Sequence, residues 1–163
     1  MARPRSFDEE EVAQKAMMAF WRHGYEGASI ADLERATGVS RISLYNAFGD
    51  KEGMFRRALR SYTIMALAGG HLEDLLAFFE EIGEAQPEDS PRNLGCLMVN
   101  TVTEVTHIGE ETKEIIRAYR EALITRFEAC LNGLQEAGAV TRAIDARGSA
   151  EYLVGALWGM LST

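Results

Sequence analysis

Long apolar runs, cysteines and strand-like alternation are all scarce in this sequence of 163 residues. No stretch of about 18 uncharged apolar residues occurs, which argues against a membrane-spanning helix. The N-terminus runs into the acidic residues 8–11 instead of an apolar segment, so we expect no signal peptide and a cytoplasmic protein. Strand signals are almost absent, and the helical spacing of the apolar residues predicts an all-α fold.

Only two cysteines are present, Cys96 and Cys130, and neither lies in a CxxC pair or near a pair of histidines. This spacing argues against a disulfide framework and against a zinc site, so we expect no metal and no cofactor. The sequence also lacks a Ser/His/Asp order, a glycine-rich phosphate loop and a His-x-x-x-His pair. We therefore do not expect an enzyme.

The net charge of −8 argues, taken alone, against a protein that binds nucleic acid. The charge is unevenly distributed, however. Residues 1–62 contain ten Lys/Arg and nine Asp/Glu, a net of +1, and residues 63–163 contain seven and sixteen, a net of −9. An acidic C-terminal part therefore follows a nearly neutral N-terminal part whose basic residues are free to occupy particular positions.

Capping residues and glycines divide the chain into segments with helical periodicity. Ser6 and Glu9 form a capping box, Gly24 offers a C-terminal stop, and Ser90 before Pro91 is a start signal. From such signals we expect eight helices, over about 6–23, 29–36, 40–48, 50–68, 71–84, 90–107, 110–137 and 145–163.

The second and third of these helices are short and are joined by a turn that contains Gly38, which is typical of a helix-turn-helix. The major groove of DNA is about 12 Å wide and admits one such helix if it projects from its support. In the third helix Leu44 and Phe48 lie four residues apart and are expected to pack inward. Ile42 and Asn46 then point almost directly away from Leu44.

The outward surface of the third helix predicts contacts with double-stranded DNA. Arg41 suits a guanine edge or a phosphate, Asn46 an adenine, and Ile42 a thymine methyl group. Tyr45 suits a phosphate, and Lys51, in the first turn of the fourth helix, adds a phosphate contact beside the free amides of that turn.

Three stretches, residues 27–33, 36–40 and 44–52, closely resemble the DNA-binding domain of the TetR/AcrR family. The resemblance covers roughly residues 7–60. It implies an Ω-shaped, all-α homodimer that binds a palindromic operator and releases it when a small-molecule effector binds the C-terminal body. Carried onto this chain, the family pattern implies base contacts from Arg41, Ile42 and Ser43, and phosphate contacts from Ser29, Ser40, Tyr45 and Lys51.

The resemblance also suggests how the chain is divided. We expect a three-helix DNA-binding domain over 1–50, joined by the fourth helix to an effector-binding and dimerisation body over 51–163. Arg3 and Arg5 would extend as an arm to the DNA backbone or minor groove. Family members usually have about nine helices, so the last helix is expected to lie beyond Thr163. The strongly apolar helix over 145–163 is expected to be covered by a partner subunit.

Cys96 is a candidate sensor in the body. It is expected in the first turns of a helix, where the positive end of the helix dipole favours a reactive thiol. The segment 95–100 is similar to one in a branch of the TetR family in which cysteine senses electrophiles or oxidants. The alternative is a small buried hydrophobic residue, since free cysteine is among the most buried residue types.

Three classes of protein remain open from the sequence. The first, which the sequence favours, is an effector-responsive repressor. The second is a regulator of the same fold that activates transcription or answers to a protein partner. The third is a helical ligand carrier or enzyme with an incidental helix-turn-helix, for which no catalytic constellation is visible.

Overall fold

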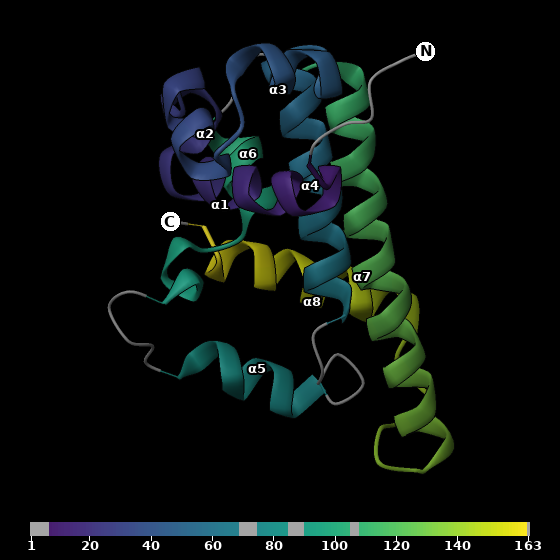
Figure 1. Ribbon diagram of the computed structural model, residues 1–163. Helices are drawn as coiled ribbons and strands as arrows, with labels where there is room; N and C mark the ends of the chain where they lie inside the picture. Colours follow the sequence, from purple (N-terminus) through teal and green to yellow (C-terminus); the bar gives the residue numbers. More distant parts are fainter. Residues whose placement is uncertain (1–6, 69–74, 85–89, 105–107, 163) are drawn as a thin grey trace.

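The computed structural model describes residues 7–68, 75–84, 90–104 and 108–162, and every regular element within these ranges is helical (Figure 1). The all-α prediction is therefore confirmed. The elements are α1 (Glu9–Gly27), α2 (Ile30–Thr37), α3 (Arg41–Phe48), α4 (Lys51–Ala68), α5 (Leu75–Gly83), a 3-10 helix η1 (Pro91–Leu94), α6 (Leu97–Glu104), α7 (Glu110–Glu136) and α8 (Ala146–Met160).

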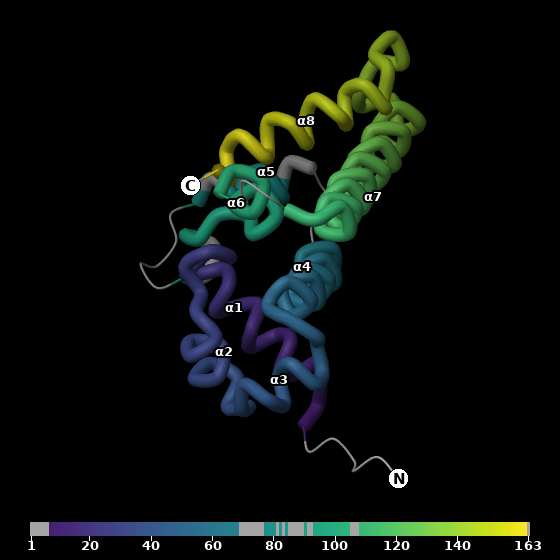
Figure 2. The backbone as a smooth tube through the Cα atoms, turned by 90° about the horizontal axis from the view of Figure 1, so that it is seen from above, coloured from purple at the N-terminus to yellow at the C-terminus, as the bar shows by residue number. Residues whose placement is uncertain are grey.

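The helices form two groups that α4 connects (Figure 2). α1, α2 and α3 gather at one end of the molecule, while α7 and α8 pack against each other at the other. α4 packs on α1 and α3, and it also contacts α6 and α7. One continuous set of buried apolar side chains runs through both groups, and the buried side chains of α4 belong to it.

Local signals start most of the helices as the sequence predicts. Ser29 and Ser40 cap α2 and α3, and Asp145 caps α8 by accepting a hydrogen bond from the amide of Gly148 at 2.8 Å. The predicted capping box at Ser6 is wrong for α1, because Asp8 is the N-cap and accepts from the amide of Glu10 at 2.8 Å. Ser6 itself lies outside the described residues.

The predicted helix start at Ser90 and Pro91 is also wrong. Pro91 begins only the short 3-10 helix η1, because Gly95 then takes a positive φ of 67° and interrupts the chain. The amide of Cys96 donates to the carbonyl of Leu161 at 3.2 Å, and α6 starts at the next residue. Cys96 therefore lies immediately before the first residue of α6, closer to its positive end than the sequence suggests.

Gly24 was expected to end the first helix, but α1 bends there and continues for one more turn. Gly24 has φ 69° and ψ 169°, a conformation that is essentially restricted to glycine. A Cβ atom at this position would also meet the carboxylate of Glu104, which would have to move aside. The bend thus needs a residue with no side chain, and it directs the following chain towards α2.

We expect Gly24→Ala to lower the free energy of unfolding by about 1–3 kcal/mol, because alanine is strained in this backbone conformation. Gly27→Ala is the matched control, since its Cβ would meet only the Cβ of His23, at an ordinary 4.0 Å. Urea unfolding followed by circular dichroism measures both. Equal stability of the two variants would contradict the role assigned to the bend.

An ion pair and a hydrogen bond join α4 to α7 at the surface. Arg56 of α4 contacts Glu52 in its own helix at 3.0 Å and Glu111 of α7 at 2.9 Å. Arg126 of α7 donates to the carbonyl of Leu67 in α4 at 2.5 Å. These contacts fix α7 along α4.

Among the helices formed by the described residues, none has the length and apolarity needed to cross a membrane.

Candidate nucleic-acid interface

The packing of α3 has the orientation that the sequence predicts. Leu44 is completely buried, and Phe48 is partly buried against the same core. Ile42 is 74% exposed, and Asn46 is also exposed. Leu44 and Phe48 therefore hold α3 against the domain while the opposite face of the helix is open to solvent. α3 lies at the end of the molecule remote from α8 (Figure 2).

The turn between α2 and α3 is held by several local contacts. Gly38 takes a positive φ of 72°, as expected for the turn glycine. The hydroxyl of Thr37 donates to the carbonyl of Leu33 at 2.7 Å, and Glu34 accepts from the amide of Arg41 at 2.5 Å. The angle between the two helices is thus fixed from both sides of the turn.

Arg41 and Tyr45 lie together on the exposed side of α3. The guanidinium carbon of Arg41 is 5.3 Å from the centre of the Tyr45 ring, a distance at which a cation is attracted to an aromatic face. Ser43 is partly exposed on the same short helix. The structure thus brings a cation, a phenol and a hydroxyl together beside Ile42, where they are able to meet base edges and phosphates.

The two cap serines are engaged within the protein. The hydroxyl of Ser29 is 2.5 Å from Oδ2 of Asp32 and accepts from the Asp32 amide at 3.2 Å. The hydrogen bonds that the hydroxyl and the amide of Ser29 donate to the Asp32 carboxylate lower the pKa of that carboxyl. The hydroxyl of Ser40 donates to that of Ser43 at 3.1 Å. Both serines are exposed, so each places a hydroxyl beside the free amides at the start of its helix.

Lys51 is tied to the end of α1, which the sequence did not predict. Its Nζ lies 4.7 Å from the centre of the Tyr25 ring and donates to the carbonyl of Glu26 at 3.4 Å. Burial, followed by the negative charge of Glu52, raises the pKa of Tyr25. Lys51 therefore positions the start of α4 as well as presenting a cation.

The predicted arm with Arg3 and Arg5 lies outside the described residues.

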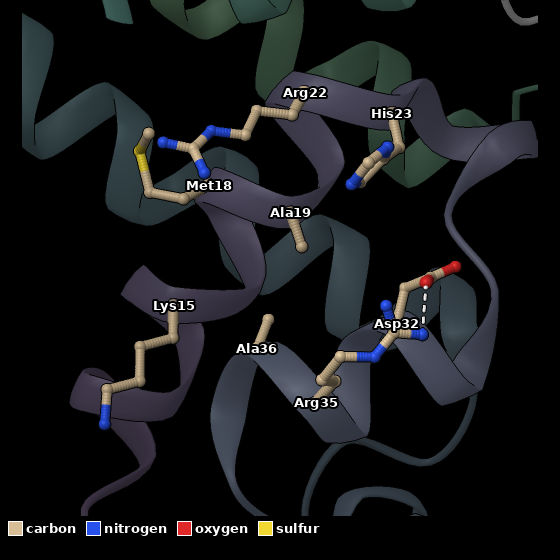
Figure 3. Close-up of a pocket in the computed structure, with 8 residues that line it drawn as sticks. All are labelled: Lys15, Met18, Ala19, Arg22, His23, Asp32, Arg35 and Ala36. Atoms are coloured by element: carbon tan, nitrogen blue, oxygen red, sulfur yellow. Dashed lines mark hydrogen bonds and ion pairs between the residues drawn. The ribbon is translucent and has the colours of Figure 1, made fainter. Parts of the chain in front are cut away.

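A second basic feature, missed by the sequence reasoning, is a groove of about 360 Å³ between α1 and α2 (Figure 3). Lys15, Arg22 and His23 line it from α1, and Arg35 from α2. Arg35 is paired with Asp32 at 3.0 Å, and Lys15 with Glu11 of its own helix at 2.7 Å. Ion pairing thus offsets much of the positive charge of the groove, in contrast to Arg41 on α3.

Cys96 lies in a polar cluster inside the body. The side chain is only 2% exposed, and the hydroxyl of Tyr62 donates to its Sγ at 3.3 Å. The ring of Tyr119 is 5.9 Å from that of Tyr62. Burial, and then the charge of a Cys96 thiolate, raise the pKa of both tyrosines, so the phenols remain protonated donors. The burial agrees with the alternative that Cys96 is a small buried hydrophobic residue. The hydrogen bond from Tyr62 shows that its sulfur also has a polar contact.

The outer face of α8 is apolar and open in this single chain. Tyr152 is 76% exposed and Met160 is 56% exposed. Gly155, Ala156 and Gly159 are also exposed, and they leave a flat surface on which a second helix is able to approach closely. Tyr152 also lines a cavity of about 570 Å³ at the contact of α7 with α8.

Comparison with known proteins agrees with this geometry. Residues 13–58 match the model of bacterial regulatory proteins of the tetR family. The chain is 32% identical over 170 aligned residues to the HTH-type transcriptional repressor ComR of Escherichia coli K12. That alignment covers 97% of this chain and 80% of ComR.

Solved structures show the same fold. The TetR family regulator CifR, as a cysteine mutant complexed with 26-bp double-strand operator DNA, is 32% identical with a TM-score of 0.76, covering 98% of this chain and 87% of that one. The reduced form of Escherichia coli NemR has a TM-score of 0.79 at 19% identity, over 93% and 84%, and supports the fold alone. This chain therefore belongs to the TetR family of bacterial regulatory proteins and is a DNA-binding transcriptional regulator.

Proposed function

We propose that the protein is a repressor that binds a palindromic operator as a homodimer and is released by a small-molecule effector or by modification of Cys96. The observation that carries this proposal is the orientation of α3, with Leu44 fully buried below and Ile42 74% exposed above. ComR, which aligns over most of this chain, is named a transcriptional repressor, and this supports repression over activation.

We assign DNA binding to residues 1–50 and effector binding with dimerisation to residues 51–163. α4 begins at the boundary and packs on both parts, so it is suited to carry a change from one to the other. Base contacts would come from the exposed side of α3, and phosphate contacts from helix starts and from the arm. The proposed DNA contacts are Arg41, Ile42, Ser43 and Asn46 for bases, and Ser29, Ser40, Tyr45, Lys51, Arg3 and Arg5 for phosphates or an adjacent groove.

The exposed apolar face of α8 supports the dimer. Tyr152 and Met160 would be costly to leave in water on a monomer, and a second copy of the same face buries both. A symmetric dimer presents two copies of α3, which must lie about 34–36 Å apart to enter successive major grooves. Any change in the body that alters this spacing weakens binding to the operator.

Selection of bound duplexes from a random-sequence library tests the DNA-binding proposal directly. We expect a palindromic consensus whose half-sites are centred one helical turn, about 10 base pairs, apart. With the selected duplex added, light scattering should give the mass of a complex that contains two copies of the protein. Recovery of sequences without two-fold symmetry would remove the homodimeric operator from the proposal.

Arg41→Ala is expected to weaken binding to the selected operator about tenfold, because one side chain able to pair with a base edge is lost. The preference for one base pair in each half-site should become weaker in a repeated selection. Arg22→Ala is the matched control, since it removes the same charge from the α1–α2 groove instead of from α3. Equal losses for the two variants would show that Arg41 contributes charge and no base contact.

A further inference from the structure

Tyr62 is the side chain at which the body and the DNA-binding end meet around Cys96. It belongs to α4, is 6% exposed, and donates its hydroxyl to Sγ of Cys96 at the start of α6. Its ring lies edge-on to Trp21 of α1, with the centroids 5.1 Å apart and the planes at 87°. It therefore contacts the candidate sensor on one side and the first helix of the DNA-binding domain on the other.

The surroundings leave Tyr62 little freedom to move elsewhere. The ring of Tyr119 of α7 is 5.9 Å away. One residue earlier in α4, the hydroxyl of Ser61 donates to Glu10 of α1 at 2.9 Å. Protein interiors are close-packed, so a group added to Sγ of Cys96 must displace a neighbour. Tyr62 and Tyr119 both interact with Cys96, and of the two it is Tyr62 that donates to Sγ and forms a T-shaped ring pair with Trp21.

Trp21 has a polar group that is not satisfied in the present arrangement. Its Nε1 is buried and has no hydrogen-bond partner among the residues that the structure describes. A buried donor without an acceptor is costly, so this side chain stands to gain from a rearrangement that gives it an acceptor or water. A displacement of the Trp21 ring therefore breaks no hydrogen bond of Nε1 within the described part of the chain.

We propose that the Tyr62–Trp21 pair is the link through which modification of Cys96 reaches the DNA-binding domain. This inference rests on the sensor role proposed for Cys96. An adduct on Sγ removes the space and the acceptor used by the Tyr62 hydroxyl. The ring of Tyr62 then presses on Trp21, and α1 shifts with respect to α4. Since α3 packs on α4 and on α2, and α2 packs on α1, a shift between α1 and α4 moves α3, and the two recognition helices of the dimer leave the spacing that the operator requires.

The test uses the full chain with Cys130→Ser and Trp158→Phe, which leaves one cysteine and, of the two tryptophans, only Trp21. N-ethylmaleimide is the probe. Sγ bonds to one alkene carbon, the π bond breaks, the neighbouring carbon takes up a proton, and the thiol proton is released. Mass spectrometry measures the adduct, Trp21 fluorescence reports the relay, and a gel shift with the selected operator reports binding.

In this background we expect the adduct to shift the Trp21 emission and to weaken operator binding about tenfold. Tyr62→Leu, which removes the ring contact, should still be alkylated but should lose the fluorescence shift, with operator binding changing only about twofold. Tyr62→Phe is the matched control, because it keeps the ring against Trp21 and should keep both responses. If Tyr62→Leu does not fold, the background protein still tests the proposal, because an adduct that leaves the Trp21 emission unchanged would contradict it.

Each of the other outcomes contradicts either the Tyr62–Trp21 link alone or the link together with the sensor role of Cys96. If the adduct weakens operator binding while Trp21 emission stays constant, or if Tyr62→Leu responds fully, the Tyr62–Trp21 link is wrong and Cys96 remains a sensor. If the adduct forms without changing operator binding, or if native Cys96 does not react at all, both the link and the sensor role fail. Operator binding by the unmodified protein is unaffected by either result and remains a separate test of the repressor proposal.

Discussion

Leu44→Ala is expected to destabilise the DNA-binding end by about 3 kcal/mol, the usual cost of deleting a fully buried leucine side chain in a close-packed core. Leu44 is 0% exposed and is the one fully buried side chain of α3, so α3 loses its main attachment. Urea unfolding measures the stability. Operator binding should fall along with it, because a detached α3 cannot be held in the groove.

Ile42→Ala is the control for this prediction, since both residues are apolar and belong to the same eight-residue helix. Ile42 is 74% exposed, so its removal should leave stability nearly unchanged and should weaken only operator binding. An equal loss of stability in Leu44→Ala and Ile42→Ala would contradict the assignment of Leu44 to the buried side of α3 and of Ile42 to the exposed side. The proposed function would then lose the observation that carries it.

The DNA-binding end was predictable because its signals are local. Ser29, Ser40 and Gly38 act on their own helix ends or turn, through contacts between residues close in sequence, and Leu44 and Phe48 follow the helical period. Such signals do not depend on the rest of the chain. A helix end was harder to predict where two local signals conflict. Ser90 and Pro91 favour a helix start, but Gly95 interrupts the chain, so α6 begins only at Leu97.

The contacts between distant segments were not predictable from one sequence. Tyr62 and Cys96 are separated by 34 positions, and neither shows a motif that names the other. Lys51 and Tyr25 meet because α4 packs back on α1, a consequence of tertiary folding and not of local pattern. The α1–α2 groove has the same origin. Sequence periodicity shows which face of each helix is apolar, but it does not show which other helix covers that face.

The double substitution Lys51→Ala with Tyr45→Phe is expected to weaken operator binding about 100-fold or more, because each copy of the proposed dimer would lose the one charged and the one neutral hydrogen bond to phosphate that we assign to these residues. The loss should be similar for the operator and for unrelated duplexes, since phosphates carry no sequence information. The slope of log affinity against log salt should become shallower by about 1 for each lysine that contacts a phosphate. Fluorescence anisotropy over a series of salt concentrations measures both quantities.

Lys51 also contacts Tyr25 and the carbonyl of Glu26, so a loss of affinity has a second possible cause. Lys51→Arg separates the two, because it keeps a cation for phosphate while changing the geometry over the Tyr25 ring. If Lys51→Arg restores affinity and salt slope without restoring thermal stability, the phosphate contact accounts for binding. If affinity instead follows stability across all variants, Lys51 acts by holding α4 on α1, and the phosphate assignment is wrong.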